Sequence, residues 1–212
     1  MKTEDLIKGL VADQVKTRSS MTDVWLWSVL TSVLISAAVF FLMVGWRADI
    51  AAAAATVRFL FKPAIALLLA LLAIQCLAKL ARPGAWRSGD RRLLFAAPAI
   101  LVVAVVLEVF IVPAPEWGSR LVGTNALVCL ATIPLLGIGP LAVSILALQH
   151  NAPTRPAVAG AVAGLSAGGL AAAFYALHCT DDSPLFVATW YTLAIAALAL
   201  VGAVSARFAI RW

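Results

Sequence analysis

The sequence predicts an all-α protein: a bundle of six transmembrane helices with a short cytoplasmic amphipathic helix at its N-terminus. Two observations carry this prediction. Of the 212 residues, 63% are hydrophobic and only 12% are charged, whereas soluble domains are about half apolar and about a quarter charged. In addition, six apolar segments are long enough to cross a hydrocarbon core of about 30 Å as helices. The composition therefore excludes a water-soluble globule.

The six predicted spans follow one another with short connections. The first span, VWLWSVLTSVLISAAVFFLMVG, contains no formal charge. The spans cover about residues 24–45, 63–80, 93–113, 124–148, 157–177 and 185–206. They form one transmembrane domain over residues 24–206, between a cytoplasmic tail of residues 1–23 and a cytoplasmic C-terminus of residues 207–212. The tail carries acids as well as bases, which is unlike a cleavable signal peptide.

The distribution of basic residues predicts the orientation. With the N-terminus in the cytoplasm, only Arg47, Arg58, Lys62 and Arg120 of the 16 Lys and Arg residues face outward. The remaining 12 face the cytoplasm, as the positive-inside rule requires, so both termini are expected there. The net charge of +6 therefore reflects the orientation of the protein in the membrane. The bases do not gather on one domain beside aromatic residues, so direct binding of nucleic acid is not expected.

A polar turn separates the fifth and sixth spans, within the stretch YALHCTDDSPLFVATWY at residues 175–191. The turn brings together an imidazole, a thiol and two carboxylates: His178, Cys179, Asp181 and Asp182. It falls on the outer side in the predicted orientation. Cys129 lies about five residues inside the fourth span, or roughly 8 Å below the outer boundary. Two of the three cysteines are thus expected at a similar depth on the oxidising side.

Three roles are possible for the two outer cysteines. A disulfide requires Cα atoms about 4.4–6.8 Å apart, which is possible if the fourth and fifth helices are neighbours. A soft divalent metal ion is the second alternative, with Cys129, Cys179, His178, Asp181 and Asp182 as candidate ligands. The third is that each cysteine only fills space in a helix. Space filling is the expected role of Cys76, near the cytoplasmic end of the second span.

The N-terminal tail has the pattern of an amphipathic helix. Leu6, Ile7, Leu10 and Val11 recur at helical spacing, and the opposite face is charged. Such a helix can lie on lipid or dock into a groove on a cytosolic protein. Its mixed charge favours a protein, so these four residues are the predicted partner-binding residues.

Two features bear on other functions. Glu108 is the exceptional carboxylate in an otherwise nearly uncharged membrane interior, although transporters usually have several such groups. Gly160, Gly164 and Gly168 recur at four-residue spacing, which predicts close helix packing. A small transporter or channel, or a membrane thiol oxidoreductase, remains the alternative function. No HExxH or paired CxxC motif is present, so no enzyme activity is expected.

Three stretches carry a resemblance to a known family. They are KTEDLIKGLVAD, GIGPLAVSILALQHNAPTRPAVAGAVAGLSAGGLAAAFYALHCTDDSPLFVATWY and the C-terminal RFAIRW. With these, the chain resembles the NrsF-type anti-sigma factors. These are six-span proteins of the bacterial inner membrane that restrain an extracytoplasmic-function (ECF) sigma factor.

The resemblance implies a partner and a signal. The partner is an ECF-type sigma factor held on the cytoplasmic side. Cys129 and Cys179 would sense stress, and the sigma factor would be released when a metal or an oxidant alters the thiols. No obligatory cofactor is implied, and a soft divalent metal ion would act only as a signal.

Overall fold

The computed structural model describes residue 4 and residues 21–82, 89–151 and 153–210. These residues form helices and no strand. The long helices are α2 (Met21–Met43), α4 (Val57–Leu80), α6 (Ala96–Ile111), α8 (Ala126–Gln149) and α9 (Pro156–Tyr175). A last helix is continuous through α10 (Pro184–Phe186), a π-helical turn η2 (Val187–Tyr191) and α11 (Thr192–Ala209). Short helices occupy the connections: α3 (Ile50–Ala53), α5 (Asp90–Leu94), η1 (Ala114–Glu116) and α7 (Trp117–Val122).

Six of the helical segments are long and apolar enough to cross a membrane. They are Asp23–Met43, Val57–Leu80, Arg92–Ile111, Ala126–Gln149, Pro156–Tyr175 and Pro184–Ala209. The predicted all-α fold with six spans is confirmed. The predicted amphipathic helix of the tail, with Leu6, Ile7, Leu10 and Val11, lies outside the described residues.

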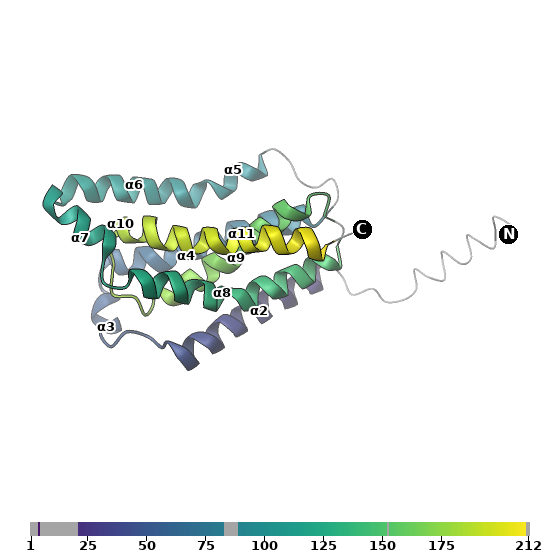
Figure 1. Cartoon of the computed structure of the whole chain (residues 1–212), viewed down its shortest axis with the longest axis horizontal. Helices are drawn as coiled ribbons and strands as arrows, with labels where there is room; N and C mark the ends of the chain where they lie inside the picture. The colour runs from purple at the N-terminus through teal and green to yellow at the C-terminus, as the bar shows by residue number, and fades with distance from the viewer. Residues whose placement is uncertain (1–3, 5–20, 83–88, 152, 211–212) are drawn as a thin grey trace.

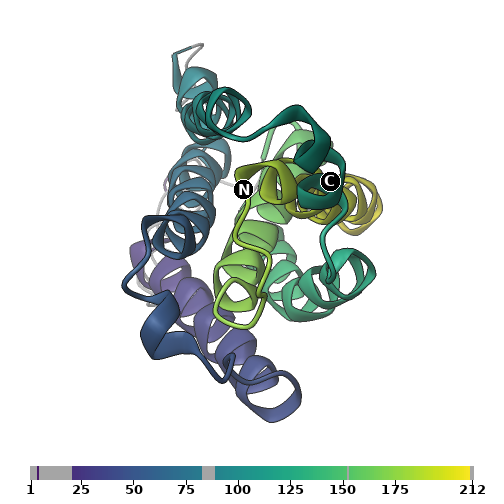
Figure 2. The ribbon, with the colours of Figure 1, turned by 90° about the vertical axis from the view of Figure 1, so that its left-hand side faces the viewer.

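Helix α9 is the central helix of the bundle. In its most hydrophobic stretch 67% of the residues are buried within the protein, a larger share than in the other five candidate spans of the described part of the chain. It packs against α11, α4 and α8, and α2 packs on α8. Figure 2 shows α9 in the middle of the bundle and α6 at its edge. The start of α2 and the end of α11 lie at the same end of the bundle, which we call the terminal end, and the other is the far end (Figure 1).

The glycine face of α9 allows the closest helix contact. A Cβ atom at Gly160 would overlap the carbonyl oxygen of Gly202 in α11, and one at Gly164 would overlap the carbonyl oxygen of Leu198. Gly168 continues this face against Ile195. Helices that approach through small residues gain backbone contact in the membrane, where burial of apolar surface contributes little. The predicted packing role of the three glycines is therefore confirmed.

The start of the second span differs from the sequence-based expectation. Helix α4 begins at Val57, because the Thr56 side chain accepts a hydrogen bond from Phe59 N and caps the helix there. The helix then continues through Pro63, the residue at which the second span was predicted to start. As a result, Lys62 lies inside the second span. Helix α8 likewise continues through two prolines, Pro134 and Pro140.

Candidate functional site: a polar cluster at the far end

The polar turn of residues 176–183 is tied to α4 by Lys62. The Lys62 side chain has no exposed surface, and its Nζ donates to the carbonyl oxygens of Cys179 at 2.8 Å and Asp181 at 2.9 Å. The same nitrogen lies 2.7 Å from Oδ1 of Asp182. An ammonium group has three donors, and all three of these contacts are to one turn. The buried charge is thus fully compensated by the segment that carries Cys179.

Arg47 ties the same turn to the segment that follows α2. Its Nη1 donates to Oδ2 of Asp182 at 3.0 Å and lies 3.4 Å from the carbonyl oxygen of Cys179. Its Nε and Nη2 donate to Asp49 at 2.6 and 2.7 Å. This bidentate pair raises the pKa of the Arg47 guanidinium and lowers the pKa of Asp49. Asp182 therefore bridges Arg47 and Lys62.

Asp181 ties the turn to the start of α8. Its carboxylate accepts hydrogen bonds from the backbone N–H groups of Thr124 (3.1 Å) and Asn125 (2.8 Å), and from Asn125 Nδ2 (3.0 Å). Gly123 makes this arrangement possible. It has a positive φ of 60°, and a Cβ atom there would collide with Asp181 and Phe186.

Glu108 connects α6 to the end of the same turn. The residue is buried, and its Oε2 accepts hydrogen bonds from Ser183 Oγ at 2.7 Å and from Leu185 N at 3.0 Å. Its Oε1 lies 3.6 Å from Nη1 of Arg120. The exceptional carboxylate predicted in the third span thus holds the start of the last helix.

The two outer cysteines are free, buried thiols at the far end. Neither Cys129, in the first turn of α8, nor Cys179 has exposed surface. Both belong to the buried core of the bundle. Tyr175 and Tyr191, the two tyrosines of the chain, are buried in the same core, with ring centroids 5.9 Å apart. Among the described residues, neither buried phenol oxygen has a hydrogen-bond partner of ordinary geometry.

The surroundings of Cys179 keep its thiol protonated. Burial raises the pKa of Cys179, although the Lys62 ammonium and the contact of Sγ with the Asp181 carbonyl oxygen (3.9 Å) partly lower it. The thiolate is the form that attacks oxidants and binds metals. In this conformation the thiol is therefore a weak nucleophile, and any ligand must displace its proton.

The remaining predicted metal ligands have other partners here. His178 Nδ1 lies 3.0 Å from the carbonyl oxygen of Gly45, and the two carboxylates are engaged as described above. Within the part of the chain that the structure describes, no three His, Cys, Asp or Glu side chains converge as a metal site. Metal binding by Cys129, Cys179, His178, Asp181 and Asp182 stays a prediction. Cys76 is buried in α4, away from this turn.

Four residues of this cluster were not singled out from the sequence: Lys62, Arg47, Tyr175 and Tyr191. The sequence places Lys62 in the loop before the second span, and Thr56, a helix-capping residue, is the signal that places it in the helix instead. Both tyrosines flank the polar turn, and their scarcity in so long a chain was a further signal. No sequence signal indicates that Arg47 folds back onto the turn, because that contact depends on the tertiary fold.

Comparison with known proteins gives a consistent result. Residues 10–212 match the family model described as "NrsF: Negative regulator of sigma F". The "Anti-sigma-F factor NrsF" of Caulobacter vibrioides is 33% identical, with 100% of both chains covered. The "Probable anti-sigma-F factor NrsF" of Azospira oryzae is 30% identical, again over 100% of both chains. No solved structure matches the chain.

Proposed function

Because the chain belongs to the NrsF family of negative regulators of sigma F, we propose that it is a membrane-bound anti-sigma factor whose outer thiols sense stress. It holds an ECF-type sigma factor at the cytoplasmic face of the bacterial inner membrane. Reaction of Cys129 and Cys179 with a soft metal ion or an oxidant releases the sigma factor. The observation that carries the sensing step is that both thiols are free and buried at the far end, Cys179 in the polar turn and Cys129 in the first turn of α8.

The arrangement of basic residues supports the proposed orientation. Arg47 and Lys62 contact the turn, and Arg58 and Arg120 line a polar cleft beside it. These are the four bases that the sequence assigns to the outer side. A periplasmic far end leaves the other 12 bases of the chain on the cytoplasmic side, as the positive-inside rule requires. Both termini are then cytoplasmic.

The chemistry of the thiols supports a switch in which the sigma factor stays bound until both thiols react. A metal ion that binds both cysteines displaces two protons, and an oxidant that joins them takes up two electrons as the protons leave. Either reaction replaces two separate thiols with one linkage, a metal ion held by two thiolates or a disulfide bond. The linkage has to change the position of Cys179, whose carbonyl oxygen is bonded to Lys62 and Arg47. The reaction therefore disturbs the contacts that hold the turn.

Helix α9 provides the route to the cytoplasmic side. It ends at Tyr175, directly before the turn, and begins at Pro156 at the terminal end. Its glycine face contacts α11 without intervening side chains, so the two helices shift together. The sigma factor is bound at the terminal end by the tail, through Leu6, Ile7, Leu10 and Val11.

Co-purification from native membranes tests this function. The full-length chain, solubilised in mild detergent, should carry a stoichiometric sigma factor that mass spectrometry identifies. Brief treatment of the membranes with Zn²⁺ or a thiol oxidant should release this sigma factor. The Cys76→Ala variant should release it equally well, and the Cys129→Ala variant should retain it. Recovery of no sigma factor from untreated membranes would contradict the proposal.

A further inference from the structure

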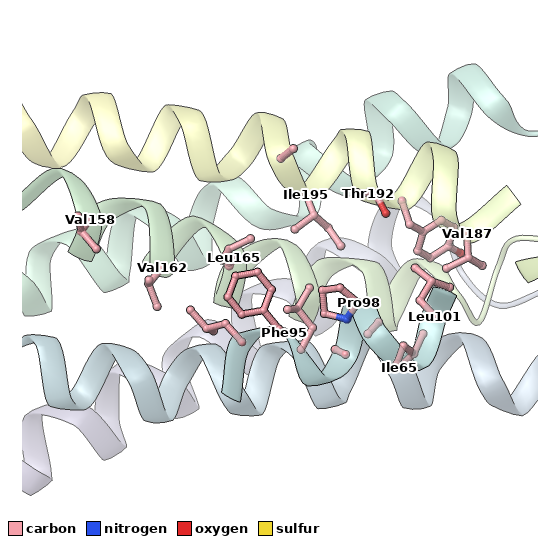
Figure 3. Close-up of a pocket in the computed structure, with 16 residues that line it drawn as sticks. Ile65, Phe95, Pro98, Leu101, Val158, Val162, Leu165, Val187, Thr192 and Ile195 are labelled. Atoms are coloured by element: carbon pink, nitrogen blue, oxygen red, sulfur yellow. The ribbon is translucent and has the colours of Figure 1, made fainter. Parts of the chain in front are cut away.

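An apolar cavity separates α6 from the rest of the bundle. It has a volume of about 470 Å³ and is lined by residues of α4, α5, α6, α9, η2 and α11 (Figure 3). Of the side chains that line it, only those of Tyr191 and Thr192 carry a polar atom. The cavity extends along the bundle axis from Val158 to Val187, at opposite ends of the view in Figure 3.

The attachment of α6 explains why the cavity is present. In α6 only Ala97 and Glu108 are buried, near the two ends of the helix. Glu108 is fixed by Ser183 and Leu185. Between these two points α6 stands away from α9 and α11. If the cavity were empty, the side chains that line it would lose van der Waals contacts. Its walls have too few polar groups to hold ordered water. An occupant with a long apolar chain fits it.

A basic cleft adjoins the cavity at the terminal end. It has a volume of about 310 Å³ and is lined by Arg155, Pro156, Ala157, Val158 and Arg207. Val158 also lines the apolar cavity, so the two spaces share a wall. Arg155 directly precedes α9 and Arg207 is in the last turn of α11, helices that Gly160 and Gly202 bring into contact. Among the described residues, neither guanidinium is paired with a carboxylate.

We propose that these joined spaces bind one anionic phospholipid, with its phosphate between Arg155 and Arg207 and an acyl chain in the cavity behind α6. Guanidinium groups bind phosphate oxygens through paired N–H donors. Basic pockets between transmembrane helices are known to bind anionic headgroups. The positive end of the α9 dipole, at Pro156, faces the same cleft. The lipid fills the gap and joins α6 to α9 and α11. This site is distinct from the thiol turn at the far end and does not depend on the proposed function.

Binding of defined lipids to the delipidated, full-length chain in detergent tests the proposal. Dioleoyl phosphatidylglycerol should raise the midpoint of thermal unfolding, and dioleoyl phosphatidylcholine, with the same acyl chains, should raise it less. The double variant Arg155→Gln/Arg207→Gln should bind phosphatidylglycerol about tenfold more weakly. Both residues are exposed, so the variant should fold. Arg58→Gln is the matched control, because it removes an exposed guanidinium at the far end and should leave the affinity unchanged.

A second variant tests the cavity itself. Ala196 is exposed on its wall, so Ala196→Trp should fill the cavity without disturbing the core and should weaken phosphatidylglycerol binding. Three results would overturn the proposal. The first is unchanged affinity in both variants. The second is equal stabilisation by inorganic phosphate, which would indicate a site for a small anion. The third is a detergent-stable dimer that Ala196→Trp dissociates, which would show that a second copy of the chain covers the cavity.

Discussion

The ammonium nitrogen of Lys62 lies 2.7 Å from Oδ1 of Asp182, and the lysine side chain is completely buried. This ion pair joins the second span to the turn before the last span, 120 positions further along the chain. Removing one partner from such a pair leaves the other charge buried without compensation, which is the costly case for a buried ion pair. The contact therefore ties the thiol-bearing turn to the bundle more strongly than the exposed pairs around it.

Replacing Lys62 with Met should destabilise the far end. The methionine fills the space, but it leaves the carbonyl oxygen of Asp181 without its Lys62 donor and Oδ1 of Asp182 without its buried counter-ion. We expect the free energy of unfolding to fall by about 3 kcal/mol, measured by denaturation in detergent. Arg58→Met is the matched control. It changes a base one helical turn earlier, which is exposed and has no ion-pair partner among the described residues, and should cost less than about 0.5 kcal/mol.

A larger residue at Gly160 should separate α9 from α11. Even the Cβ atom of Gly160→Ala overlaps the backbone of Gly202, and backbone cannot move aside as a flexible side chain can. Overpacking of this kind costs about 1–3 kcal/mol. Gly118→Ala in α7 is the control, because a Cβ atom there meets nothing within 4 Å. Equal thermal stability of the two variants would show that the close contact is not needed.

Composition and the length of the apolar segments were sufficient to predict the six spans, because an apolar helix must be long enough to cross the bilayer whatever its neighbours are. The close packing of α9 could also be predicted from the sequence, because four-residue spacing places Gly160 and Gly164 on one side of a helix. Both predictions depend only on local geometry, and the structure confirms them.

The interior of the far-end cluster could not be predicted in the same way. The sequence predicts that the second span begins at Pro63, but Lys62 lies inside the helix because the turn supplies two carbonyl oxygens and a carboxylate to its ammonium group. Those acceptors lie more than a hundred positions away in sequence. The hydrogen bond from Ser183 to Glu108 could not be predicted either. Ser183 reaches Glu108 only because the last helix starts beside α6. Long-range compensation of a buried charge leaves no local pattern.

The reactivity of Cys179 should depend on pH in an unusual way. Because burial raises its pKa, the thiolate fraction at neutral pH is smaller than for an ordinary cysteine, whose pKa is about 8.5. The rate of reaction with a small methanethiosulfonate reagent should therefore still increase above pH 8.5, where a free thiol is levelling off. The measurement uses the Cys76→Ala/Cys129→Ala chain, with a short cysteine peptide as the reference. A rate that levels off below pH 8 would contradict the protonated resting state.

The tail should bind the sigma factor through its apolar face. Under the proposed function, Leu6→Asp/Leu10→Asp places two carboxylates in a buried helix–groove contact, where they cannot be solvated. Co-purified sigma factor should fall by at least about tenfold, while the amount of chain in the membrane stays the same. The Lys8→Asp variant puts the same carboxylate on the charged face and should retain binding. Equal loss in both variants would indicate a general effect of charge on the tail.

The two outer cysteines should act as one unit in stress release. If Cys129 and Cys179 bind one metal ion or form one bond, then neither thiol can respond without the other. Cys129→Ala and Cys179→Ala should each abolish induction of a sigma-dependent reporter, and the double variant should equal either single variant. Cys76→Ala should respond normally, because Cys76 is buried in α4 away from the turn. Alanine leaves only a small gap in each case, so the protein level on immunoblots should be unchanged. A graded response, in which each single variant loses half of the induction and the double variant loses all of it, would show that the thiols react independently.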